Sequence, residues 1–163
     1  MAKKLIVVTS SAFKPGDRIP QRHASPEEGK NVSPPISWTG VPPAAKQLAL
    51  IVDDPDAPSA QPWVHWLLYR VPAATSSLAE GIPAESKELR TPAGAAQGVN
   101  SWKKVGWGGP LPPVGHGVHH YHFKLYALDA PLALQPGASK DDLLRAMTGH
   151  VLAEGELIGT YRR

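Results

Sequence analysis

The chain has 163 residues, a formal net charge of +3 at neutral pH and no cysteine. Its length fits a single domain over residues 1–163 with one hydrophobic core. Without cysteine, the chain has no disulfides, no thiolate metal sites and no thiol catalysis. Its basic residues are scattered, whereas nucleic-acid-binding proteins concentrate them on one face or helix, so we expect no nucleic-acid partner.

A first strand is expected at Leu5–Val8. These apolar residues follow two lysines, as in a signal peptide, but the run is shorter than the roughly 7–15 apolar residues that a signal needs. No stretch of the chain approaches the about 20 apolar residues that cross a bilayer. We therefore expect no membrane insertion and a cytoplasmic location.

Short strands separated by turns are expected along the rest of the chain, because 18 prolines and 15 glycines are spread through it. Apolar and β-branched runs predict further strands at Ile36–Trp38, Gln47–Val52, Trp63–Val71, Tyr121–Leu128 and Leu157–Tyr161. A helix is predicted at Lys140–Met147, where Ser139 can cap the first turn. Gly149 should interrupt this helix before a second short helical turn at Val151–Glu154. The pattern predicts a mainly β protein.

A first polar cluster directly follows the strand Gln47–Val52 and reads Asp53-Asp54-Pro55-Asp56-Ala57-Pro58. Because side chains alternate along a strand, Asp54 shares the face of Leu50 and Val52. The proline after Asp54 holds its backbone out of the helical region and fixes its direction. A carboxylate that ends a core-facing row is a candidate functional group. Aspartate and proline are also ordinary turn residues, so a turn without a function remains the alternative.

A second cluster lies within the strand Trp63–Val71. Alternation places Trp63, His65, Leu67 and Tyr69 on one face and Val64, Trp66 and Leu68 on the other. Both faces are apolar, as in a strand that is covered on both sides. A buried histidine there needs a hydrogen-bond partner, either in a functional site or as a satisfied core residue.

A third cluster begins with the irregular loop 108–113, whose backbone N–H groups could form a concave anion site. In the strand that follows, His119 and Tyr121 share one face, and His120 and His122 are expected to point to solvent on the other. Four histidines between positions 116 and 122 raise the question of a metal. Since His120 and His122 have no third ligand nearby in the sequence, we expect no metal site.

Several catalytic and nucleotide-binding motifs are missing from the sequence. The chain contains no Gly-x-Ser-x-Gly turn of a serine hydrolase. It also contains no phosphate-binding Gly-x-x-x-x-Gly-Lys-Ser/Thr loop and no dinucleotide-binding fingerprint. These absences favour a binding protein, and we expect no catalytic residues and no cofactor.

Taken in order, the motifs are Asp-Pro-Asp-Ala-Pro, Trp-x-His, and Gly-Gly-Pro-x-Pro-Pro with His-x-Tyr about ten residues on. This order resembles the phosphatidylethanolamine-binding protein (PEBP) family, and most closely its bacterial Raf kinase inhibitor-like branch, the YbhB/YbcL type. The resemblance extends almost from end to end. Further matching segments are Phe13-Lys14-Pro15-Gly16, Asn31–Trp38, Gly98-Val99-Asn100, Gly149–Ala153 and Gly159-Thr160-Tyr161.

The resemblance implies a large central antiparallel sheet, a smaller second sheet and a few short peripheral helices. It also implies a pocket for a phosphate-like or carboxylate group. Its members would be Asp54, His65 and His119 as the polar core, Tyr121 as a lining residue, Trp63 and Pro58 as walls, the Gly109-Pro110 backbone as donors, and Asp56 as a brace for the loop. Two imidazoles beside a carboxylate, which favours their protonated forms, suit an anion in a mostly apolar cavity.

The chain departs from the eukaryotic members of the family in three places. Val64 and His120 stand where those members often carry a histidine and an arginine. The chain stops at Arg163, so we expect it to lack the C-terminal helix that borders the pocket in eukaryotic members. The two substituted positions lie on the strand face opposite the expected pocket, so the anion site itself is expected to persist.

The leading hypothesis is a protein that binds a phosphorylated or carboxylated small molecule, a phospholipid head group or a phosphorylated side chain. Two alternatives are a docking inhibitor of a kinase or protease, as the family name implies, and a weak esterase or hydrolase that uses Asp54 and His65 as a base pair. Bacterial relatives imply a homodimer. The sequence names no other protein partner.

Overall fold

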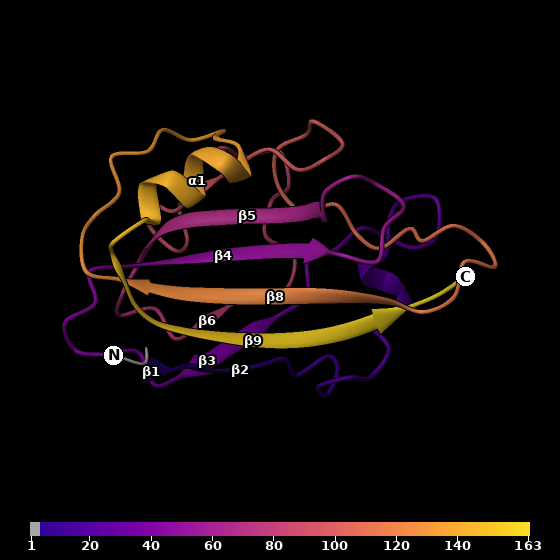
Figure 1. Ribbon diagram of the computed structural model, residues 1–163, viewed down its shortest axis with the longest axis horizontal. Coiled ribbons are helices and arrows are strands. Elements are labelled where there is room, and N and C mark those ends of the chain that lie inside the picture. Colours follow the sequence, from indigo (N-terminus) through magenta and orange to yellow (C-terminus); the bar gives the residue numbers. More distant parts are fainter. Residues whose placement is uncertain (1–3) are drawn as a thin grey trace.

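The computed structural model describes residues 4–163, and within them the chain forms nine strands, one α-helix and one short 3₁₀ helix (Figure 1). The strands are β1 (Lys4–Leu5), β2 (Val7–Thr9), β3 (Ile36–Thr39), β4 (Gln47–Asp54), β5 (Trp63–Pro72), β6 (Ser77–Leu78), β7 (Ala96–Gln97), β8 (His119–Leu128) and β9 (Val151–Tyr161). The helices are η1 (Gln21–His23) and α1 (Lys140–Met147). The predicted mainly β class is confirmed.

The strands form two sheets. The larger sheet has six strands in the order β1-β9-β8-β4-β5-β7, and the smaller one has three in the order β2-β3-β6. Pairing is antiparallel except between β1 and β9. In Figure 1 the long strands β5, β4, β8 and β9 lie side by side, with the smaller sheet behind them. The large central sheet and the smaller second sheet expected from the sequence are therefore confirmed.

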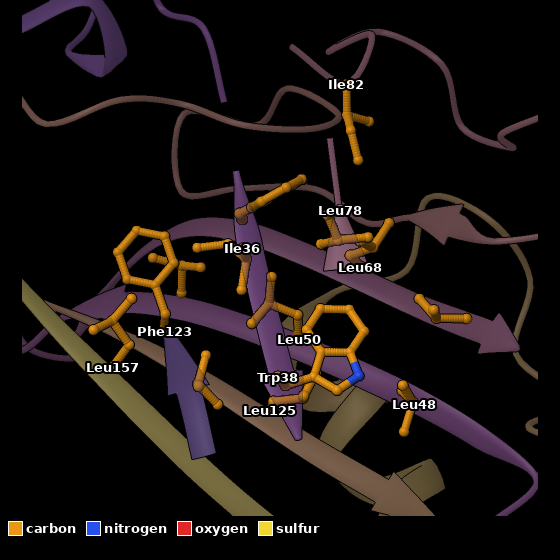
Figure 2. Close-up of a cluster of buried hydrophobic side chains, with 14 of the residues drawn as sticks. Ile36, Trp38, Leu48, Leu50, Leu68, Leu78, Ile82, Phe123, Leu125 and Leu157 are labelled. Atoms are coloured by element: carbon orange, nitrogen blue, oxygen red, sulfur yellow. The ribbon is translucent and has the colours of Figure 1, made fainter. Parts of the chain in front are cut away.

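Apolar side chains cover both faces of the large sheet. The main core lies between the two sheets, where Ile36, Trp38 and Leu78 of the small sheet meet Leu50 and Phe123 of the large one (Figure 2). A second core lies on the opposite face, where α1 packs against the large sheet through Leu143 and Met147. Because β4 is covered on both faces, every residue from Leu48 to Asp54 is buried.

Strand β5 does not alternate regularly. Its pairing with β4 shifts by one residue, since Val52 faces Trp66 whereas Asp53 faces Val64. The extra residue between them is His65, which is the pattern of a β-bulge. The His65 ring packs against Trp107, as Trp66 does, so both side chains lie on the side of the main core. The prediction that Trp66 and His65 face opposite ways is therefore wrong.

Leu67 and Tyr69 also depart from the predicted faces of β5, because both belong to the second core beside α1. They were expected on the face of Trp63 and His65. The bulge at His65 reverses the order of the faces for the residues that follow it.

Two other segments differ from the sequence prediction. The expected first strand, Leu5–Val8, is divided between β1 in the large sheet and β2 in the small one, with the buried Ile6 between them. The expected helical turn at Val151–Glu154 is wrong, because β9 begins at Val151 and pairs along its whole length with β8. Gly149, at φ +82°, turns the chain sharply between α1 and β9.

Candidate functional site

Three strands bring the predicted polar residues to one edge of the large sheet. Strand β4 ends at Asp54, β5 begins at Trp63 and β8 begins at His119, and these ends lie together at the right of Figure 1. A cavity of about 230 Å³ opens there. It is lined by Asp54, Ala57, Pro58, Ser59, Trp63, His65, Trp102, Leu111, Pro112, Pro113, His119 and Tyr121. Six of the side chains predicted for the pocket therefore converge.

Asp54 and His119 form the buried polar pair of the cavity. They are 2% and 1% exposed, and the Nδ1 of His119 lies 2.6 Å from the Oδ2 of Asp54. Since a carboxylate oxygen only accepts, His119 Nδ1 carries the proton, and its Nε2 faces away from Asp54, 2.6 Å from the Nδ1 of His116. The other oxygen of Asp54 accepts the backbone N–H of Asp56 at 2.8 Å. Asp54 therefore orients His119, and both of its oxygens already have partners.

His65 has a different partner and a different electrostatic state. Its Nδ1 donates to the carbonyl oxygen of Gly108 at 2.6 Å, so Asp54 and His65 are not hydrogen-bonded to each other. Burial lowers the pKa of His65 from 6.5 to about 4, against the opposing effects of the Gly108 hydrogen bond and the Asp54 charge. At neutral pH the ring is neutral, and its Nε2 is an acceptor. The hydrogen-bonded pair of Asp54 and His65 that the hydrolase alternative assumed is therefore not formed.

Aromatic rings form the wall around His65. Trp102 meets His65 edge to face at a centroid distance of 5.1 Å, and it meets Trp63 in the same way at 5.5 Å. Tyr121 also meets the His65 ring edge to face, at a centroid distance of 5.0 Å. Burial, together with the charges of Asp54 and Asp56, raises the pKa of Tyr121, so its hydroxyl keeps its proton.

Sequence reasoning missed Trp102 because it lies in a loop six residues before the third predicted cluster, outside all three clusters. The only signal nearby is the motif Gly98-Val99-Asn100, which precedes it directly. Asn100 shapes this loop, because its side-chain oxygen accepts the backbone N–H groups of Trp102 and Lys104. The motif was read as a family marker, whereas its physical role is to place the Trp102 ring.

The Gly109-Pro110 backbone does not serve the cavity in the expected way. The N–H of Gly109 donates to the side-chain oxygen of Asn31 at 2.7 Å, and proline has no N–H. The carbonyl of Pro110 accepts the N–H of Ser25. Neither residue lines the small cavity. Gly109 instead borders a neighbouring cavity of about 680 Å³, which shares Trp102 and Leu111 with the first.

Asp56 braces the loop after β4. Its Oδ2 accepts both the backbone N–H of His120, at 2.8 Å, and the Nδ1 of the same residue, at 2.7 Å. Burial of Asp56 opposes ionisation, but the hydrogen bonds from His120 outweigh it and lower the pKa of this carboxyl group. His120 points away from the cavity and is exposed. His122, expected in solvent, is half-buried and lies 3.0 Å from Glu156.

Within residues 4–163, no group of three or more histidine, aspartate or glutamate side chains is arranged to hold a metal ion. The helices of the same part of the chain are all too short or too polar to cross a membrane.

Comparison with known proteins agrees with the resemblance seen in the sequence. Residues 9–162 match the sequence model described as phosphatidylethanolamine-binding protein. A UPF0098 protein of Methanothermobacter thermautotrophicus is 52% identical over 152 residues, which are 93% of this chain and 95% of the relative.

Two solved structures are also similar. E. coli YbcL, described as a new member of the mammalian PEBP family, has a TM-score of 0.89 at 32% identity, covering 97% of this chain and 98% of its own. The PEBP homolog CT736 from Chlamydia trachomatis has a TM-score of 0.85 at 38% identity, covering 98% and 99%. The chain belongs to the phosphatidylethanolamine-binding protein family.

Proposed function

We propose that this protein binds a phosphate-like group, carried by a small molecule, a lipid head group or a side chain, in the cavity between β4, β5 and β8. The observation that supports this most is the buried pair of Asp54 and His119, because it turns the His119 Nε2 away from Asp54, to the side where an anion could take the place of His116. A carboxylate bonded to the far nitrogen of an imidazole stabilises the protonated ring. An anion that receives a hydrogen bond from this ring gains a charge-assisted contact.

His65 adds selectivity in the proposal. Its neutral ring offers an acceptor at Nε2, beside the donor that His119 offers. A phosphomonoester that keeps one proton has both a hydroxyl to donate and charged oxygens to accept. A sulfonate has only the acceptors. The site should therefore prefer a monoprotonated phosphomonoester to a sulfonate of the same size.

The surroundings of the cavity suit a bound anion. Apolar walls from Pro58, Trp63 and Trp102 exclude water and strengthen each polar contact inside. The nearby carboxylates of Asp54 and Asp56 are each hydrogen-bonded to an imidazole, that of His119 and that of His120. An anion at His119 therefore meets a paired carboxylate and not a free one.

The proposal is tested by calorimetric titration of a phosphomonoester and a sulfonate at about pH 6, 7 and 8.5. Affinity for the phosphomonoester should weaken as the pH rises, because both the imidazole and the ligand, with its second pKa near 6, lose protons. The charge of the sulfonate is constant, so the pH dependence of its affinity reports on the imidazole alone. His119→Gln should lower affinity at pH 6 and flatten the sulfonate profile, since glutamine donates but does not titrate.

His122→Gln serves as the matched control, because it changes the same residue type on the same strand but on the face away from the cavity. It should leave affinity within about 0.5 kcal/mol of the unchanged protein. A flat sulfonate profile in the unchanged protein would remove the protonated imidazole from the mechanism. Equal affinity for both ligands at pH 6 would remove the acceptor role of His65.

A further inference from the structure

His116 occupies the position next to the ligand-facing nitrogen of His119. Its Nδ1 lies 2.6 Å from the His119 Nε2, and the two ring centroids are 4.9 Å apart. One proton lies between two nitrogens at this distance, so either His116 donates to His119 or the reverse. An Nε2 that is engaged with His116 is not free for a strong hydrogen bond to an anion. His116 and an anion therefore compete for the same nitrogen.

The two histidines are held very differently. His119 is buried and bonded to Asp54, whereas His116 is exposed on the loop between loop 108–113 and β8. Gly115 and Gly117 flank His116 with φ values of +77° and +99°, and a Cβ atom at either would meet nothing within 4 Å. The backbone N–H groups of Gly115 and His116 are bonded to the carbonyls of Arg163 and Pro113, so it is the exposed His116 side chain that can turn away, while His119 is fixed. Displacing His116 costs little more than its hydrogen bond to His119.

We propose that His116 is a specificity-determining residue of the anion site, which competes with the ligand for His119 Nε2 and is released by protonation. The inference rests on the proposed function of the site. A single proton joins the two rings both in the neutral pair and in a pair that has gained one proton. Only when both rings are imidazolium are both facing nitrogens donors, and the hydrogen bond between them is then lost. At neutral pH, an anion that bonds only to His119 must displace His116. A phosphomonoester that also donates to His65 offsets that cost.

The two rings lie among charged groups. The titratable and charged groups that face the two rings from the neighbouring elements are Asp54, Asp56, His65, Tyr121 and Arg163. Asp54 and Asp56 are negative, and a negative charge stabilises an imidazolium ring close to it. His65 and Tyr121 stay neutral around neutral pH, and Arg163 opposes protonation from beyond the Gly115 backbone, to which its carbonyl is bonded. Two nearby negative charges therefore face one positive charge.

The test uses methanesulfonate, whose charge is constant, and calorimetric titration at about pH 8 and pH 6. His116→Ala should bind it about threefold to tenfold more tightly than the unchanged protein at pH 8, the range expected for removing one competing hydrogen bond. The ratio of the affinity of His116→Ala to that of the unchanged protein should approach one at pH 6, where protonation of both rings releases His116. His116→Asn places an amide near the position of Nδ1 and does not titrate. It should match the unchanged protein at pH 8 and bind more weakly than it at pH 6.

His122→Gln is again the matched control and should follow the unchanged protein at both pH values. Weaker binding by His116→Ala at both pH values would overturn the inference, because it would make His116 a direct donor to the anion. Equal tightening at both pH values would overturn release by protonation. If the unchanged protein binds and His119→Gln does not, but His116→Ala changes nothing, this inference alone fails. If no form binds methanesulfonate or inorganic phosphate at millimolar concentration, the proposed function fails with it.

Discussion

Two buried histidines of this protein are neutral for the same reason. His65 is 2% exposed and His23 is fully buried, and in both cases burial is the largest influence and lowers the pKa. Each ring satisfies its Nδ1 with a backbone carbonyl, that of Gly108 for His65 and that of Val32 for His23. A neutral imidazole in the core keeps the fold intact at neutral pH but makes it sensitive to acid.

The free energy of unfolding should therefore fall as the pH drops from about 6.5 towards 4. In that window the unfolded chain protonates His65 while the folded chain, with its pKa of about 4, does not. Protons then favour the unfolded state, and the loss from this residue amounts to a few kcal/mol. His65→Gln should reduce the slope, and the remainder should come partly from His23, whose pKa shifts the same way. Urea denaturation followed across this pH range measures the effect.

His150→Gln is a suitable control for this prediction, because the His150 imidazole is exposed and paired with Asp129. It should leave the slope nearly unchanged. An unchanged slope in His65→Gln, or stability that does not depend on pH between 6.5 and 4, would show that His65 is protonated in the folded protein.

At the level of single residues, alternation along strands was a good guide to the pocket where the strand is regular. His119 and Tyr121 in β8, and Asp54 at the end of β4, point where the pattern predicted. The Gly109 N–H and His116 were not predictable in this way. Their positions depend on loop conformation, which is set by contacts distant in sequence such as that of Asn31 with Gly109.

Among the secondary-structure elements, β5 and β9 show what sequence patterns leave out. The bulge in β5 depends on its pairing with β4. Because β5 carries apolar residues on both faces, its sequence does not show where the register with β4 shifts. The inward face of β9 carries Ala153, Gly155 and Gly159, which are small and not strand-forming by propensity. In the structure the burial of β9 alternates from Ala153 onwards, and the matching sequence signal, small or apolar residues alternating with Glu154 and Glu156, was overlooked when a helical turn was predicted at Val151–Glu154.

Helix α1 was predicted with its correct bounds, because its signals are local. Ser139 caps it, its side-chain oxygen accepting the Asp142 N–H at 3.2 Å. The helix is also tied to the large sheet by Lys140, whose Nζ lies 2.8 Å from the buried carboxylate of Asp53. The helix covers the face of the sheet opposite the main core, and none of its residues lines the pocket.

Ser139→Ala should lower the free energy of unfolding by about 1 kcal/mol, because it leaves a backbone N–H of the first turn without its cap. Ser139→Asp, which can cap equally well, should be nearly neutral. Urea denaturation measures both. Affinity for a phosphomonoester should stay unchanged in the alanine variant. A loss of affinity would indicate that α1 supports the pocket, contrary to its position in the fold.

At the scale of the whole molecule, one of the links between the two sheets is a single residue at their edge. Leu5 belongs to the large sheet and Val7 to the small one, so the chain crosses from one to the other at Ile6. The Ile6 side chain is buried in the main core, and its N–H donates to the carbonyl of Glu154 at 2.9 Å. The backbone of β9 therefore lies directly against this crossing.

Gly155 allows this close approach. A Cβ atom at position 155 would overlap the carbonyl oxygen of Ile6, and it would lie 2.7 Å from the carbonyl carbon and 3.0 Å from the Ile6 Cβ. Because these are backbone atoms in a packed region, they cannot turn away as a flexible side chain would. Separating the two segments would break the Ile6–Glu154 hydrogen bond and loosen the packing of Ile6 between the sheets.

Gly155→Ala should therefore lower the free energy of unfolding by about 3 kcal/mol or more, since overpacking and a lost buried hydrogen bond add together. Gly149→Ala is the matched control. Position 149 has a positive φ, but a Cβ atom there would meet nothing within 4 Å. The substitution should therefore lower the free energy of unfolding only by the strain of left-handed backbone, about 1 kcal/mol. Urea denaturation of both variants at neutral pH measures the difference. Equal destabilisation by the two substitutions would show that Ile6 moves aside freely, and that the crossing between the sheets is not held rigidly by β9.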